Sequence, residues 1–174
     1  MAKKYLGFAA LVCAAWTQLG QAECTIAEEV KHLDPVEVGF CESDAVFIGK
    51  VDARLETIRA YTAEGSNRTE HYRIERSTVR VLDQFKGELP EKVSMIADLY
   101  DKKSGAFSFE NGKEYLVFAK RLSNDNEYAG ASERCSVQPT LPLHAAAKAI
   151  EQLKLHRSGT KKIDCRNLRA KQAS

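Results

Sequence analysis

Cysteines are the residues of this chain that most clearly indicate a defined chemistry. Cys13 lies in the apolar N-terminal segment, and Cys24, Cys41, Cys135 and Cys165 lie beyond it. No two are separated by two residues, and none is spaced from a histidine as in a zinc finger, so a metal site is not expected. An even number of cysteines in an exported chain predicts two disulfides, for which four cysteines allow three pairings.

Motifs for catalysis are absent from the sequence. None of the G-x-S-x-G, H-E-x-x-H, phosphate-loop or dinucleotide-binding patterns occurs. The histidines at positions 32, 71, 144 and 156 are isolated from one another, which is typical of surface or locally hydrogen-bonded histidines. Glu70 and His71, with Glu75 nearby, lie in a strand-like segment and are interpreted as a solvated face. We therefore predict a binding protein without catalytic residues or a cofactor.

The N-terminal residues have the pattern of an export signal. Lys3 and Lys4 precede an apolar run from Leu6 to Trp16, and Gly20-Gln21-Ala22 supplies small residues for cleavage. The run is shorter than the roughly 20 apolar residues that a membrane-spanning helix needs. We predict a signal peptide over residues 1–22, no membrane span, and a secreted or periplasmic location.

The charge of the remaining chain limits the class of partner. Residues 1–22 contain two lysines and no acidic residue, so the other 152 residues contain 24 basic and 24 acidic residues. That length is enough for one domain. Zero net charge and export argue against a nucleic-acid partner, and we expect a monomer. Lys154 to Ser174 contains seven basic residues and one acidic residue, which predicts a basic C-terminal tail over residues 166–174.

Segments rich in β-branched and aromatic residues predict a mainly β fold. The first strand is expected over residues 44–54, where the apolar run predicts burial on both faces. In the second, over residues 72–82, Tyr72 and Ile74 alternate in one phase and Val79 and Val81 in the other, which predicts a bulge near Ser77-Thr78. Further strands are expected over residues 92–99, 113–119 after the tight turn at Asn111-Gly112, and 127–132.

Helices are expected on both sides of these strands. Ile26, Val30 and Leu33 are spaced for a helix over residues 25–33 that Asp34-Pro35 ends. Apolar residues between Leu143 and Leu155 form one face of a closing helix. A helix, four or five antiparallel strands and a second helix favour a small closed or partly open barrel.

Four segments, in order along the chain, resemble the netrin-like superfamily that includes the tissue inhibitors of metalloproteinases. Phe40 to Val51 is similar to the family's cysteine, short acidic turn and first barrel strand, and Phe85-Lys86-Gly87 follows the second strand. Phe109 to Ala119 is similar to the family's glycine turn and next strand, and Cys135-Ser136 matches the cysteine after the last barrel strand. The resemblance covers most of residues 24–165.

The resemblance implies a fold and a disulfide pairing. The fold is mainly β with flanking helices: an OB-like five-stranded closed barrel over residues 23–165, stapled by disulfides. The implied disulfides join Cys24 to Cys135 and Cys41 to Cys165.

This chain departs from the family at its expected N-terminus. The family's mature chain begins with a cysteine that pairs with a loop cysteine, and its amine and carbonyl chelate the zinc of a protease. Ala22 and Ser104 stand at these two cysteine positions, so the third disulfide is missing and the mature chain is expected to begin at Glu23.

The resemblance also implies a binding ridge and a function. The function is inhibition of a zinc metalloendopeptidase through the mature N-terminus, with a non-inhibitory partner-binding or scaffold module as the alternative. The expected ridge consists of Glu23, Cys24, Thr25, Tyr100, Lys102, Lys103 and Ser104.

Overall fold

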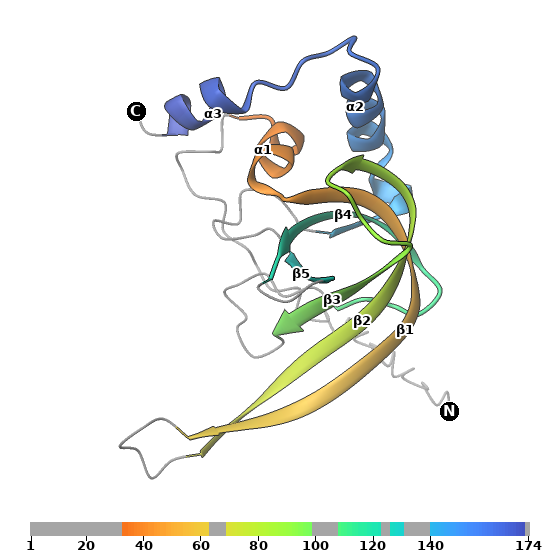
Figure 1. The fold of residues 1–174 in the computed structure, drawn as a ribbon, viewed down its shortest axis with the longest axis vertical. Helices are drawn as coiled ribbons and strands as arrows, with labels where there is room; N and C mark the ends of the chain where they lie inside the picture. The colour runs from red at the N-terminus through yellow and green to blue at the C-terminus, as the bar shows by residue number, and fades with distance from the viewer. Residues whose placement is uncertain (1–32, 63–68, 99–107, 123–125, 131–139, 173–174) are drawn as a thin grey trace, which may run out of the picture.

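The fold is a small β-barrel covered at one end by helices (Figure 1). The computed structural model describes residues 33–62, 69–98, 108–122, 126–130 and 140–172. The elements, in chain order, are α1 (Pro35–Glu42), β1 (Ala45–Thr62), β2 (Thr69–Lys86), β3 (Lys92–Asp98), β4 (Glu114–Arg121), β5 (Glu127–Gly130), β6 (Thr140–Pro142), the 3₁₀ helix η3 (Leu143–Ala145), α2 (Ala147–Arg157) and α3 (Cys165–Gln172).

Five strands close into a barrel. β1 pairs antiparallel with β2, β2 with β3, and β4 with both β5 and β1, whereas β3 and β5 are parallel. The short strand β6 extends the sheet beside β4. This closed five-stranded arrangement confirms the predicted OB-like barrel with flanking helices. The expected strands over residues 92–99 and 113–119 correspond to β3 and β4, and Gly112 in the preceding turn has a φ of 77°.

Two apolar clusters lie on the two faces of β4 and β1. Tyr115 and Val117 of β4 belong to the cluster inside the barrel, whereas Leu116 and Phe118 pack with α1, α2 and α3 on its outside. In β1 the same alternation places Phe47 inside the barrel, and its neighbours face the helices. The predicted burial of the first strand on both faces is therefore confirmed over its first residues.

β1 and β2 are much longer than predicted, and three irregularities make them curl around the barrel. Asp52 is an extra residue of β1 between the pairs Val51–Val79 and Ala53–Thr78. Leu82 and Phe85 are extra residues of β2. The predicted irregularity therefore exists beside Thr78, but it lies in β1.

The predicted change of phase within β2 is wrong. Glu75, Ser77 and Val79 are all buried, so a single alternation runs through this part of the strand. From Glu75 towards the barrel, every second residue of β2 lies on the same face of the strand. The alternation is not interrupted there because the extra residue belongs to the partner strand β1.

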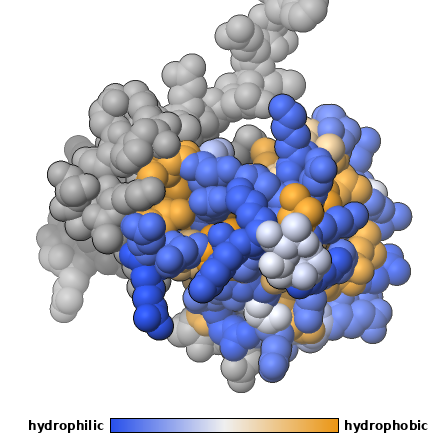
Figure 2. Space-filling view, turned by 90° about the horizontal axis from the view of Figure 1, so that it is seen from above, coloured by the Kyte–Doolittle hydropathy of each residue, from blue (hydrophilic) through white to orange (hydrophobic). Residues whose placement is uncertain are grey.

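The β1–β2 hairpin continues beyond the barrel as an arm, which comprises Ala53–Thr62 and Thr69–Thr78. β3 pairs with β2 from Ile74 to Arg80, and in the described part of the chain no other strand pairs with the outer part of the arm. Figure 1 shows the arm projecting away from the helices. Leu55 and Ile58 on the arm are 63% and 67% exposed. In contrast, the helix-covered end in Figure 2 is mainly hydrophilic, with separate apolar areas.

Asp34 begins a helix that was not predicted from the sequence. The Asp34 carboxylate accepts hydrogen bonds from the amides of Val36 at 2.8 Å and Glu37 at 3.3 Å, and Pro35 occupies the first turn of α1. An aspartate N-cap followed by proline is a favourable helix start. The helix expected over residues 25–33 lies almost entirely outside the described residues.

The C-terminal segment, expected to be a basic tail, contains helix α3. Leu168 of α3 is buried in the cluster beneath the helices, and a disulfide of 2.07 Å joins Cys165 to Cys41 of α1. This is one of the two implied pairings. The expected closing helix forms as η3 followed by α2.

Candidate functional site: a buried carboxylate at the base of the arm

Glu75 is a fully buried carboxylate at the base of the arm, with a relative exposure of 0%. It lies in β2 opposite Glu56 of β1 on one side and Ala97 of β3 on the other. The interpretation of Glu75 as part of a solvated face is therefore wrong. Burying a charge is costly unless it is paired and hydrogen-bonded, so its partners are the informative feature of this site.

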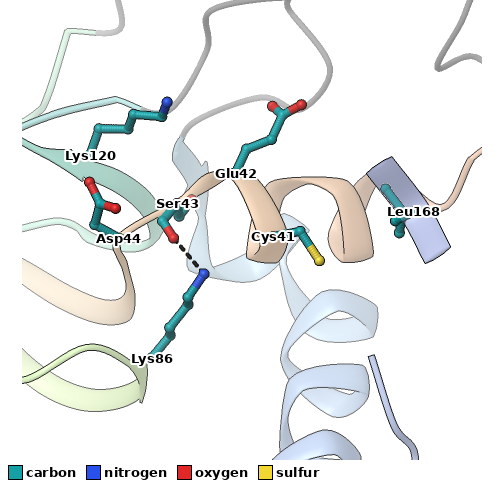
Figure 3. A pocket seen from close by; sticks show the side chains of 7 residues that line it. All are labelled: Cys41, Glu42, Ser43, Asp44, Lys86, Lys120 and Leu168. Atoms are coloured by element: carbon teal, nitrogen blue, oxygen red, sulfur yellow. Dashed lines mark hydrogen bonds between the residues drawn. The ribbon is translucent and has the colours of Figure 1, made fainter. Parts of the chain in front are cut away.

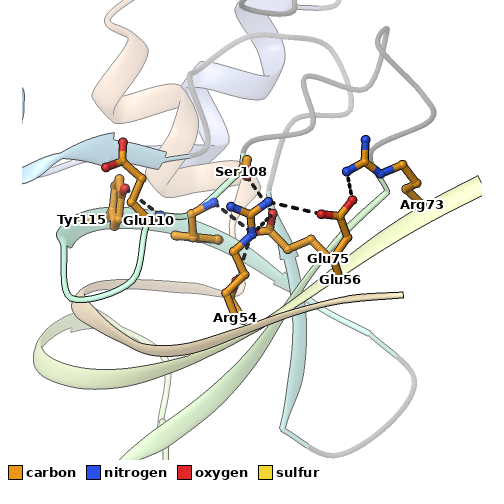
Figure 4. A network of polar contacts seen from close by, with 9 residues as sticks. Arg54, Glu56, Arg73, Glu75, Ser108, Glu110 and Tyr115 are labelled. Atoms are coloured by element: carbon orange, nitrogen blue, oxygen red, sulfur yellow. Dashed lines mark hydrogen bonds and ion pairs between the residues drawn. The ribbon is translucent and has the colours of Figure 1, made fainter. Parts of the chain in front are cut away.

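Both carboxylate oxygens of Glu75 have two partners (Figure 4). Oε2 lies 2.8 Å from Nε of Arg54 and accepts a 2.7 Å hydrogen bond from Oγ of Ser108. Oε1 accepts hydrogen bonds from Oγ of Ser77 at 3.1 Å and from the amide of Phe109 at 2.9 Å. The carboxylate thus joins β1, β2 and the segment before β4.

The network continues to the surface along the arm. Arg54 also lies 3.7 Å from Glu56, which forms an ion pair with Arg73 across the hairpin. Positive and negative side chains therefore alternate from the barrel interior outward, in the order Glu75, Arg54, Glu56, Arg73 (Figure 4). We refer to these four residues with Ser77 and Ser108 as the Glu75 network.

The segment next to the network is fixed by a second set of contacts. The ring of Phe109 packs edge-to-face on Tyr115 with centroids 5.2 Å apart, and the amide of Glu110 donates a 3.1 Å hydrogen bond to the Tyr115 hydroxyl. Burial raises the pKa of Tyr115, and the carboxylates of Glu110 and Glu75 add to this effect. The phenol therefore stays neutral in this apolar and negatively charged environment.

Glu75 also contacts both flanks of the segment that contains part of the expected ridge. Its neighbour Ala97 is one residue before the end of β3, and its hydrogen-bond partners Ser108 and Phe109 follow residue 107. The ridge residues Glu23, Cys24, Thr25, Tyr100, Lys102, Lys103 and Ser104, and also Cys135, lie outside the described residues.

A pocket of about 400 Å³ lies at the helix-covered end, but its residues have structural roles (Figure 3). Nζ of Lys86 donates hydrogen bonds to the carbonyls of Phe40 at 2.6 Å and Ser43 at 2.5 Å, at the C-terminus of α1. A β-carbon on Gly87, whose φ is 83°, would lie 2.8 Å from the carbonyl of Asp44. These contacts explain why a lysine ends β2 and a glycine follows it. The pocket is lined by Cys41, Glu42, Ser43, Asp44, Lys86, Lys120 and Leu168.

The described residues contain no cluster of metal ligands. No group of three or more histidine, cysteine, aspartate or glutamate side chains in this part of the chain is arranged to hold a metal ion. His156 has a local role, because its Nδ1 accepts a 3.3 Å hydrogen bond from the amide of Ile163 and its ring packs edge-to-face on the ring of Phe40. Among the described residues, no helix has the length and apolar character required to cross a membrane.

No protein-family model matches the sequence, and no curated protein matches it.

Proposed function

We propose that this chain is an exported protein-binding module that contacts its partner with the end of the barrel at which Glu75 lies. The observation that carries this proposal is the buried carboxylate of Glu75 with its four partner atoms. Replacing a buried ion pair by well-packed apolar side chains of similar volume is often neutral or stabilising. The network is therefore better explained by a positioning role, which is to fix the flanks of residues 99–107 beside the arm.

The specific activity that we propose is inhibition of a zinc metalloendopeptidase. Support comes from the resemblance to the tissue inhibitors of metalloproteinases, since the closed barrel and the Cys41–Cys165 disulfide agree with what that resemblance implies. In this proposal the α-amine and carbonyl of Glu23 bind the protease zinc, and Tyr100, Lys102 and Lys103 contact the rim of the active site. The disulfide also agrees with an exported location.

Inhibition assays with a panel of H-E-x-x-H proteases test this activity. The mature protein, with its start at Glu23 verified by mass spectrometry, is expected to inhibit at least one of them at micromolar concentration. A matched variant with one alanine added before Glu23 is expected to lose inhibition, because one residue moves the amine by about 3.8 Å. Absence of inhibition by the verified mature protein across the panel would reject the inhibitor proposal.

The alternative is a non-inhibitory partner-binding or scaffold module. Ala22 and Ser104 stand where the family has the two halves of its third disulfide, which leaves Glu23 without that anchor. The Glu23 side chain would also approach the glutamate base of the protease, an unfavourable contact between like charges. Binding to a partner that is unchanged by the added alanine but weakened by Glu75→Gln would favour this alternative.

A further inference from the structure

Among the residues that the structure describes, no strand pairs with one edge of β1 along the arm. β4 pairs with β1 from Ala45 to Lys50, and Val51 still exchanges hydrogen bonds with Gly112 and Lys113. From Ala53 to Thr62, β1 pairs with β2 on one side, and no described strand pairs with its other side. A row of unpaired backbone groups on such an edge is suited to pairing with another strand.

This edge has only some of the features by which proteins usually prevent strand pairing, since Arg54, Glu56 and Arg59 are charged. Proline, lysine and bulges are common protective devices on edge strands. The segment Ala53–Thr62 contains no proline, glycine or lysine, and the bulge at Asp52 lies at its root. Leu55, at 63% exposure, is a large apolar side chain beside this edge.

The root of the arm is held in a fixed direction. Arg54, the second residue of this edge, is 2.8 Å from the buried Glu75 carboxylate, and Glu56 forms an ion pair with Arg73 of the opposite strand. A strand that is already ordered loses less conformational freedom on pairing. The edge is therefore prepared to accept a strand near residues 54–56.

We propose that this edge pairs antiparallel with the same edge of a second copy of the chain, with Leu55 opposite Leu55 on the two-fold axis. In an antiparallel pair, directly opposite residues have their side chains on the same face of the sheet. The two-fold axis therefore has to lie where a residue faces the same residue of the second copy. With the axis at Leu55, each Arg54 faces Glu56 of the second copy. With the axis at Glu56, two carboxylates would face each other.

The side chains at this centre are available for the contact. Arg54 and Glu56 have side-chain exposures of 33% and 31%. They lie on the same face as Glu75, so pairing across the axis extends the alternating charges of the Glu75 network into the second copy. Leu55 lies on the opposite face and meets its counterpart there. The paired segment, Ala53 to Thr57, buries less surface than a typical interface of about 1,600 Å², and the dimer is accordingly weak.

Sedimentation equilibrium of the mature, disulfide-intact protein tests the dimer and its register. The wild type forms a reversible dimer at high micromolar concentration. Leu55→Lys places two like charges opposite each other and raises the dissociation constant at least about tenfold. Ile58→Lys is the matched control, since Ile58 is equally exposed on the same strand but lies on the other face and away from the axis. It changes the dissociation constant less than about threefold.

Cross-linking provides a second readout that does not depend on a charged substitution. Opposite Cα atoms in an antiparallel pair are about 4.5–5.5 Å apart, within the range of a disulfide. Leu55→Cys therefore forms a covalent dimer on mild oxidation, whereas Ile58→Cys stays monomeric. A wild type that is monomeric at all concentrations, or equal effects of the two lysine variants, would overturn the proposal. Pairing of this edge only with a different protein would give the first of these results.

Discussion

Arg54 and Glu75 are brought together by one extra residue in β1. Nε of Arg54 lies 2.8 Å from Oε2 of Glu75, although Arg54 is paired in register with Ser77. Side chains alternate between the two faces of a strand, and Asp52 has no register partner in β2, although its carboxylate forms an ion pair with Arg80. Without Asp52, Arg54 would lie on the face that Leu55 occupies, and the buried carboxylate would lose its cation. The bulge therefore positions Arg54 within the Glu75 network.

Glu75→Gln is expected to destabilise the protein by about 1–3 kcal/mol, because Arg54 loses its buried counter-charge while the shape of the side chain is kept. The cost stays in this range because the Arg54 side chain is one-third exposed and water screens it. Urea unfolding measures the difference. Glu56→Gln is the control, since that partly exposed carboxylate contributes less than about 1 kcal/mol. Equal stabilities of the two variants would contradict a special role for Glu75.

Loss of the Cys41–Cys165 disulfide is expected to lower stability strongly. The bond joins residues 124 positions apart, and a loop of that size corresponds to roughly 4–5 kcal/mol in the chain-entropy model. Thermal unfolding of the double variant Cys41→Ala/Cys165→Ala, compared with wild type, measures the loss. A melting temperature within a few degrees of the wild type would show that the helices dock on the barrel without the bond.

Gly49→Ala is expected to destabilise the hairpin where it curls. A β-carbon at position 49 would lie 2.4 Å from Cγ1 of Val79 and 3.0 Å from the ring of Phe47. Overpacking of this kind costs about 1–3 kcal/mol. Adding Val79→Ala removes the closest atom, so the double variant should lose less stability than the sum of the single variants. Simple additivity in chemical denaturation would rule out the steric explanation.

The strands inside the barrel could be predicted from the sequence because their residues are apolar on both faces. Tyr115 to Ala119 is an uninterrupted buried run, and the turn before it has the Asn-Gly pair that a positive φ requires. The parallel pairing of β3 with β5 has no local signal, since it joins segments separated by the whole of β4.

Glu75 could not be predicted because its burial depends on distant residues. Alternation of charged and polar side chains in residues 70–78 is typical of a solvated strand, and Arg54 reaches Glu75 only through the register that the bulge sets. The start of α1, in contrast, had a readable signal. Asp34-Pro35 fits the first residues of a following helix as well as the end of a preceding one. Helix α3 was missed because Leu168 is its sole buried residue among those with described side chains.

Asp34 is expected to make stability depend on acidic pH. Burial acts to raise the pKa of Asp34, but hydrogen bonds from Gln152 and from the amides of Val36 and Glu37 outweigh it and hold the pKa below its ordinary value of 3.8. Lys161 acts in the same direction. Because the folded pKa is lower than the unfolded one, the carboxylate stabilises the fold above about pH 4, and this contribution is lost as the pH falls through the folded pKa.

Two variants separate the charge of Asp34 from its capping role. Asp34→Ala removes both and is expected to cost about 1 kcal/mol at pH 7, a difference that shrinks below about pH 4 as the wild-type carboxylate is protonated. Asp34→Asn keeps an N-cap acceptor for α1, so its loss at neutral pH is smaller and its acid dependence is weaker than that of the wild type. Urea midpoints measured between about pH 2.5 and 7 provide the comparison. A constant gap between Asp34→Ala and the wild type over that range would mean that the carboxylate charge does not stabilise the start of α1.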